Sequence, residues 1–182
     1  MAEERDAVDV LEADHRAVEV LLSQLEQQAE AAPKRALDEA VRSLSMHSAI
    51  ELELLYPMVA DRLDGGVDAA KQARLDHQEV EMTMLRLQSV PMSTSEFREE
   101  LSRFVAEVRA HVRTEETSLF PMLRATVDAG DLARLGSRLE HAKRHAPTRP
   151  HPHAPKSALG AKLADRVAGA LDRLRDRGRR AS

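Results

Sequence analysis

One pattern occurs twice in this chain, and its residue types are those that bind metal ions. Each copy has one histidine and then, about one helix later, a His-x-x-x-Glu pair: His15 with His47 and Glu51, and His77 with His111 and Glu115. Residues four apart lie on the same face of an α-helix, so each His and Glu of a pair point into the same space. Imidazole and carboxylate ligands without a thiolate suit iron, manganese or zinc.

The number of these groups favours two metal ions over one. A single histidine in an apolar helical stripe is more often a hydrogen-bonded core residue than a ligand. Four histidines on four predicted helices are harder to explain by packing, because buried carboxylates without partners are costly. Four His and two Glu exceed the ligand set of one tetrahedral zinc. The pattern therefore predicts two metals bridged by two carboxylates.

Acidic residues beside the pattern have less certain roles. Glu19 and Glu81 also follow a histidine by four residues, so they could fill an open metal position or hydrogen-bond outside it; we expect them not to be direct ligands. Asp14 and Asp76 point about 100° away from the histidines that follow them. They could orient an imidazole of another helix, but we expect solvated charges.

Three further residues are predicted to lie off the metal-facing side. Tyr56 falls nine residues after His47, about half a turn off its face in a regular α-helix, and is expected to be a packing residue. Glu53 and Glu116 also fall off the ligand faces and are expected at the surface.

Four helices must position these groups. Apolar residues recur at helical spacing over residues 6–31, 33–63, 67–89 and about 94–130. Short connections make neighbouring helices antiparallel, which predicts an all-α, up-down-up-down four-helix bundle. Pro57 lies inside the second helix and should bend it or loosen one hydrogen bond. A short fifth helix is expected over residues 131–145.

The last part of the chain differs in composition. Residues 1–146 are predicted to form the metal-binding bundle, 147–156 a Pro/His-rich linker, and 157–182 a basic amphipathic helix. Residues 141–182 carry 11 Lys and Arg against 3 Asp and Glu, so this tail can dock on the acidic bundle or on an anionic partner. Without aromatic stacking residues, it does not favour nucleic acid. The four histidines of this region could bind a metal weakly, but a solvated linker is the favoured interpretation: His141, His145, His151 and His153.

Composition excludes several classes of protein. Cysteine is absent, which rules out disulfides, thiolate zinc sites and iron–sulfur clusters. The first residues lack an apolar run of signal-peptide length, and no stretch is long enough to span a membrane. We therefore expect a cytoplasmic protein without a membrane span. The sequence does not indicate the oligomeric state.

The repeated pattern, with Tyr56-Pro57 and Phe120-Pro121 after its two copies, resembles the hemerythrin-like, or HHE cation-binding, domain family over about residues 6–130. The resemblance implies a non-haem di-iron centre with two iron ions, oxo-bridged, in a four-helix bundle. By matching positions, it implies that His15 and His47 serve one iron, that His77 and His111 serve the other, and that Glu51 and Glu115 bridge them. A ferritin-like pattern fits less well because it needs Glu-x-x-His and more carboxylates.

One departure from the family bears on function. Oxygen-carrying hemerythrins use a fifth histidine, and no fifth bundle histidine is found here. Two open and similar irons would favour redox turnover over reversible oxygen carriage. The resemblance thus implies a protein that reacts with O2, H2O2 or NO, with catalase-like peroxide breakdown or an oxidative-stress role as possible activities. The alternative is a non-catalytic oxygen or iron binding or sensing protein whose basic tail contacts a partner.

Overall fold

The computed structural model describes residues 5–27, 34–146 and 148, and these form helices and short connections without a strand. The predicted basic helix, and the predicted linker apart from Thr148, lie outside the described residues. Two of the long helical segments, here called rods, are each interrupted by a π-helical turn. The elements are α1 (Ala7–Gln27), α2 (Lys34–Ile50), η1 (Glu51–Leu55), α3 (Tyr56–Arg62), α4 (Gly66–Ser89), α5 (Ser95–Thr114), η2 (Glu115–Leu119), α6 (Phe120–Thr126) and α7 (Ala129–Lys143).

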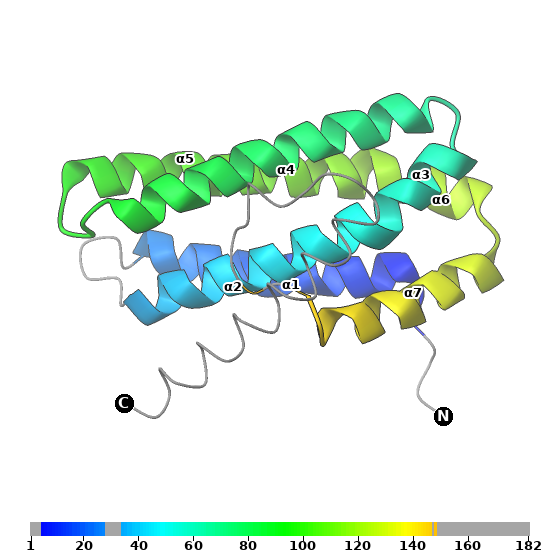
Figure 1. The fold of residues 1–182 in the computed structure, drawn as a ribbon, viewed down its shortest axis with the longest axis horizontal. Coiled ribbons are helices and arrows are strands. Elements are labelled where there is room, and N and C mark those ends of the chain that lie inside the picture. The colour runs from blue at the N-terminus through cyan, green and yellow to red at the C-terminus, as the bar shows by residue number, and fades with distance from the viewer. Residues whose placement is uncertain (1–4, 28–33, 147, 149–182) are drawn as a thin grey trace.

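The four long rods alternate in direction and form the predicted all-α bundle (Figure 1). One rod runs through α2, η1 and α3, and another through α5, η2 and α6. The helix α7 packs along α1 and also contacts α2 and η1, so it covers one side of the bundle. The expected short fifth helix is therefore present, although it begins two residues before the predicted start.

Local sequence signals explain where the helices begin and end. The side chain of Thr94 accepts a hydrogen bond from the backbone N–H of Phe97 at the start of α5, and Asp128 caps α7 in the same way through Asp131. Between α3 and α4, Gly65 has a φ of 68°, a left-handed conformation that suits glycine.

The two prolines inside the rods are accommodated by π-helical turns. Pro57 and Pro121 lie in the first turns of α3 and α6, directly after η1 and η2. Since proline cannot donate the usual hydrogen bond, the ladder widens: Tyr56 N–H bonds to the carbonyl of Glu51, and Phe120 N–H to that of Glu115. The predicted local loosening at Pro57 thus takes the form of a wide turn that begins at a predicted ligand.

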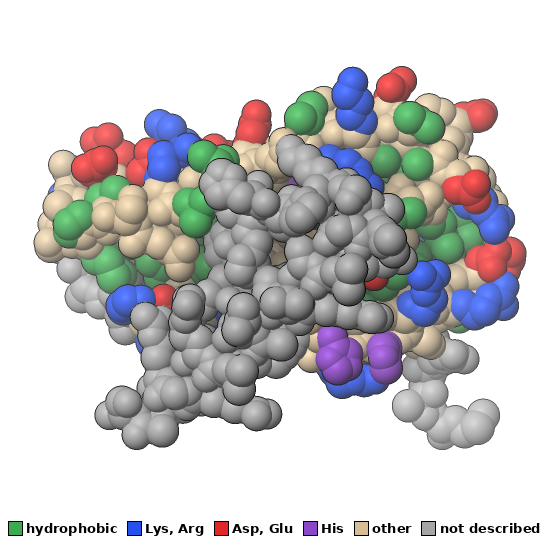
Figure 2. Space-filling model, in the orientation of Figure 1, with side chains coloured by type: hydrophobic (Ala, Val, Ile, Leu, Met, Phe, Trp, Pro, Cys, Tyr) green, Lys and Arg blue, Asp and Glu red, His purple; other side chains and the backbone are tan. Residues whose placement is uncertain are grey.

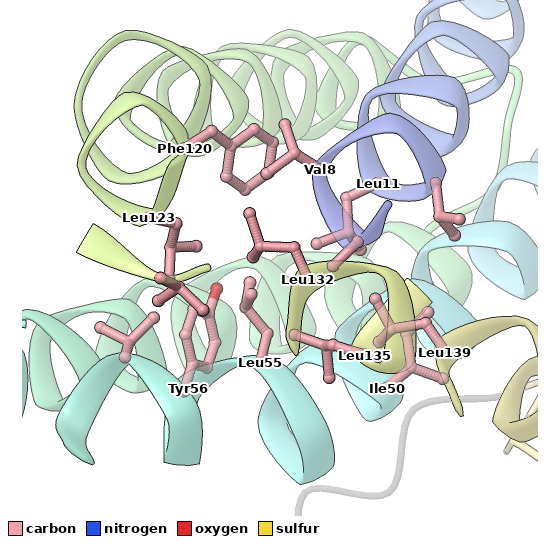
Figure 3. Packing of buried hydrophobic residues seen from close by; sticks show 14 of the residues in the cluster. Val8, Leu11, Ile50, Leu55, Tyr56, Phe120, Leu123, Leu132, Leu135 and Leu139 are labelled. Atoms are coloured by element: carbon pink, nitrogen blue, oxygen red, sulfur yellow. The ribbon is translucent and has the colours of Figure 1, made fainter. Parts of the chain in front are cut away.

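Two apolar clusters fill the bundle. The first joins the start of α1 to η1, α3, α6 and α7, and includes Val8, Leu55, Leu123 and Leu132 (Figure 3). The second joins the later part of α1 to α2, α4 and α5, and includes Leu22, Leu44, Met84 and Phe104. The histidine-bearing turns lie between the two clusters.

The visible surface of the described residues carries interspersed acidic and basic side chains (Figure 2). Five large apolar side chains are exposed, one on α1, three on α4 and one on α6: Val20, Val67, Leu75, Met82 and Met122. None of the described helices is both apolar enough and long enough to cross a bilayer.

Candidate metal centre

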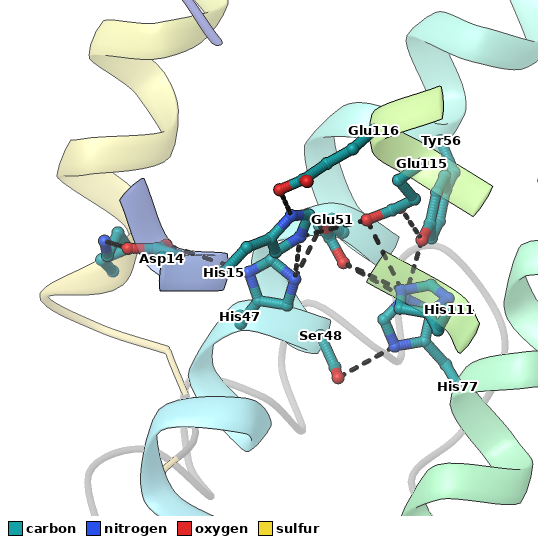
Figure 4. Close-up of polar contacts among 11 residues, drawn as sticks. Asp14, His15, His47, Ser48, Glu51, Tyr56, His77, His111, Glu115 and Glu116 are labelled. Carbon is teal, nitrogen blue, oxygen red and sulfur yellow. Dashed lines mark hydrogen bonds and ion pairs between the residues drawn. The ribbon is translucent and has the colours of Figure 1, made fainter. Parts of the chain in front are cut away.

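Six predicted ligand side chains meet in the middle of the bundle (Figure 4). They come from four rods, and each is buried. Their ligand atoms form two groups, within each of which the atoms lie within 4.8 Å of one another. Both groups contain the same two carboxylates: His15, His47, Glu51 and Glu115 in one, and Glu51, His77, His111 and Glu115 in the other.

Glu51 lies between the two groups with one oxygen toward each. Its Oε1 is 3.1 Å from Nε2 of His47. Its Oε2 is 3.2 Å from Nε2 of His77 and 3.9 Å from Nε2 of His111. A carboxylate with its two oxygens divided in this way has the disposition that a bridge between two cations requires.

Glu115 is shared less evenly. Its Oε2 is 3.3 Å from Nε2 of His15 and 3.6 Å from Nε2 of His111. Its Oε1 instead accepts a hydrogen bond of 2.7 Å from the hydroxyl of Tyr56. The two Nε2 atoms of His15 and His47 lie 3.2 Å apart, so the imidazole nitrogens and carboxylate oxygens face one common space.

Several buried polar atoms in this space have no hydrogen-bond partner. They are both oxygens of Glu51, Oε2 of Glu115 and Nε2 of His111. Leaving such groups unpaired in a protein interior is costly. Divalent or trivalent cations would satisfy all of them at once, and imidazole and carboxylate are suitable donors for iron, manganese or zinc. The donor set therefore fits a pair of metal ions.

Two of the imidazoles are oriented through their second ring nitrogen. Nδ1 of His15 lies 2.9 Å from Oε1 of Glu116, and Nδ1 of His77 lies 2.9 Å from the Ser48 hydroxyl. Such contacts fix which nitrogen faces a metal. The expectation that Glu116 is a plain surface residue was incomplete, because its half-exposed carboxylate reaches inward to a buried histidine.

Asp14 lies near a histidine on another helix. Its Oδ2 is 3.9 Å from Nδ1 of His47, and its Oδ1 accepts a hydrogen bond from Lys143 of α7. Asp14 is thus partly buried and paired with Lys143, unlike the solvated charge that was expected, but it makes no hydrogen bond to His47.

The two aromatic residues that follow the π turns behave differently. The Tyr56 hydroxyl lies 2.7 Å from Nε2 of His77, the nitrogen that faces Glu51. Phe120, at the equivalent place, has no hydroxyl and stacks on the His15 ring at 5.6 Å with an interplanar angle of 10°. Tyr56 is thus a polar member of the site as well as a packing residue. A phenol oxygen in this place is also a possible metal ligand.

Burial and charge shift several pKa values. Burial acts to lower the pKa of His15, but Glu115 and the charge of Glu51 outweigh it and raise that pKa to about 9. For His77, burial dominates and the pKa falls below its usual value. Burial and the neighbouring carboxylates both raise the pKa of Tyr56 well above its usual range.

The remaining acidic residues of the pattern lie outside the two ligand groups. Glu19 is bonded to Arg109 and Ser23, which supports the expectation that it is not a direct ligand. Glu81 is partly buried and belongs to neither group among the described residues. Glu53 is exposed, as expected.

Two relatives are similar to about three quarters of this chain. An uncharacterized hemerythrin-like protein of Schizosaccharomyces pombe is 28% identical over 137 residues, which are 75% of this chain and 68% of that protein. A DNA nickase of Nostoc is 25% identical over 138 residues, or 74% of this chain but only 38% of that longer protein.

A solved structure shares the fold. The crystal structure of a hemerythrin HHE cation-binding domain-containing protein from Mycobacterium kansasii has a TM-score of 0.64 and 22% identity, and covers 77% of this chain and 88% of its own. The sequence model of the protein family described as the hemerythrin HHE cation binding domain matches residues 6–123. The resemblance noted in the sequence is therefore confirmed, and this chain belongs to the hemerythrin HHE cation-binding domain family.

Proposed function

We propose that the protein is a non-haem di-iron protein that reacts with a small oxidant or diatomic molecule, namely O2, H2O2 or NO. The observation that carries this proposal is the pair of overlapping ligand groups that share Glu51 and Glu115. In the proposal, His15 and His47 hold one iron, His77 and His111 hold the other, and the two carboxylates serve both. When bound, two neighbouring irons supply redox chemistry toward oxygen species.

The protein's own residues would control the surroundings of the centre. Glu116 and Ser48 hold the imidazoles of His15 and His77 in place. The hydroxyl of Tyr56 donates a hydrogen bond to Oε1 of Glu115 and holds that carboxylate in place. The apolar clusters on either side exclude bulk water, which strengthens every charge interaction inside the site. These features support a centre that keeps a reactive ligand away from solvent.

Tyr56 and Phe120 also bear on the earlier expectation of two similar, open irons. Near symmetry of the sequence pattern favoured that expectation, but a hydroxyl lies on the His77 side and a stacked phenyl ring on the His15 side. We therefore propose two chemically distinct irons. A difference of this kind suits redox turnover, because the two metals need not perform the same role.

Metal analysis and a visible spectrum of protein produced with iron test the assignment. We expect about two irons per chain in the wild type and loss of most iron in His47→Ala, because Glu51 then lies buried beside a missing ligand. His141→Ala is the matched control, since His141 is an exposed histidine of α7. A His47→Ala protein that still holds two irons with an unchanged spectrum would refute the ligand assignment.

The reaction with H2O2 then distinguishes a catalytic function from a binding function. A catalase-like protein should release oxygen from H2O2 in repeated turnovers, while a carrier or sensor should leave most peroxide intact. Iron-loaded protein that binds NO or O2 without consuming peroxide would favour the non-catalytic alternative.

A further inference from the structure

A solvent-facing cleft of about 260 Å³ runs between α1 and α5 and reaches the candidate metal centre. His15 forms part of its lining. Apolar walls come from Val18, Leu22, Val108 and Val112, and polar residues lie along it: Glu19, Arg109, Arg113, Glu116 and Thr117. Two arginines and two glutamates give the cleft no net formal charge.

A second, much smaller cavity lies directly behind this cleft. It measures about 10 Å³ and is bordered by all four bundle histidines, a volume close to that of one water-sized sphere. Glu51 and Glu115 do not line it, so it lies on the apolar side of the imidazoles. Val18, Val108, Val112 and His15 line both spaces, and they therefore form the partition between them.

The two copies of the sequence pattern differ at this cleft. Arg109, Arg113, Glu116 and Thr117 give the second copy its polar lining, and the equivalent places of the first copy hold Ser45, Ala49, Leu52 and Glu53. Ala49 and Leu52 pack against the first apolar cluster, where α7 contacts α2 and η1. A polar, open lining at this place is thus a property of the α5 rod and not of the repeated pattern.

An ion-pair strap spans the same cleft. The guanidinium of Arg109 on α5 bonds to Glu19 at 2.6 Å and to Glu26 at 2.8 Å, both on α1. The strap joins the two helices that flank the cleft. These side chains are more than one third exposed, so the pairs add little stability and can open without large cost.

We propose that the α1/α5 cleft is the route by which small ligands reach the centre, with Val18, Val108 and Val112 as the gate. The proposal rests on the di-metal function above and adds the path and the ligand class to it. The apolar partition and the 10 Å³ inner cavity suit uncharged molecules of a few atoms, such as NO, O2 or H2O2. Larger or charged molecules would stop in the outer cleft.

The absence of cysteine from the sequence permits a sharp test, since one introduced thiol can be labelled alone. Thr117→Cys places it in the cleft. Thr114→Cys is the matched control, because Thr114 is also exposed, also bonds to the carbonyl four residues earlier, and does not line the cleft. Each full-length variant is loaded with iron, labelled with pyrene maleimide after folding, and mixed with nitric oxide in a stopped-flow instrument.

We expect the label on Thr117→Cys to slow both association and dissociation of nitric oxide by about tenfold or more while Kd stays the same, because a blocked path changes rates and not end states. The labelled control should retain wild-type rates. Equal rates in the two labelled proteins would overturn the route, and so would a large change in Kd. If unlabelled, iron-loaded protein neither binds nitric oxide nor reacts with O2 or H2O2, the proposed function itself fails, whatever the two labels do.

Discussion

His15 should make the stability of the metal-free protein depend on pH. Its pKa is raised from 6.5 to about 9, since Glu115 and Glu51 outweigh the effect of burial. The folded state therefore binds this proton more tightly than the unfolded state. The resulting stabilisation is fully present below about pH 6.5 and is lost as the pH rises through about 9.

The size of the effect follows from the pKa difference. Each pH unit of difference is worth about 1.4 kcal/mol, so His15 can contribute up to about 3 kcal/mol. Its side chain is only 2% exposed, so solvent screens it little. The pKa of His111 is raised as well, against the effect of burial and mainly by Glu51, and it acts in the same direction. The lowered pKa of His77 opposes both.

Urea unfolding followed by circular dichroism measures this effect on chelator-treated protein at about pH 6 and pH 9.5. We expect lower stability at the higher pH by about 2–3 kcal/mol. His15→Gln should remove most of the difference. The affinity of the protein for metal should instead rise with pH, because protons and metal ions compete for the same nitrogen atoms. Metal-free protein that is equally stable at both pH values, or a His15→Gln variant that keeps the full slope, would refute this reasoning.

Two substitutions test other parts of the structure. Tyr56→Phe leaves Oε1 of the buried Glu115 without its hydroxyl partner, so urea unfolding of the metal-free variant should show a loss of about 1–3 kcal/mol; unchanged stability would contradict that role. Gly136→Ala would place a Cβ atom 2.5 Å from the carbonyl oxygen of Arg5 and should lower the melting temperature. Gly130→Ala is its control, because the nearest atoms there belong to the side chains of Asp128 and Arg134 at 3.2 Å and 3.4 Å, which can move, so its melting temperature should change much less. Greater stability of Gly136→Ala than of the wild type would show that the close approach is not a constraint.

The sequence predicted the bundle well because apolar periodicity and short connections are local signals. The number of long helices and their antiparallel order follow from them. Helix ends were less accurate. The periodic pattern also gave no sign that each proline would be accommodated by a five-residue π turn, since that choice depends on the whole hydrogen-bond ladder.

The same π turns explain why Tyr56 was placed on the wrong face. Nine residues after His47 amount to about two and a half turns of a regular α-helix. A π turn absorbs about one extra residue, which rotates everything after η1 back toward the His47 face. Tyr56 therefore points at His77. Glu116 was missed for another reason: its contact with His15 joins two helices, and spacing within one helix cannot reveal it.

The position of the centre between two apolar clusters has a consequence for the order of assembly. Each cluster is built from several rods, so the rods are held together both above and below the polar layer without any ligand in it. The chain can therefore reach its native topology first and acquire its cofactor afterwards. Metal ions would then enter a protein that is already folded. The rate of metal uptake should depend on how fast the ions move through the protein and not on how fast the chain folds.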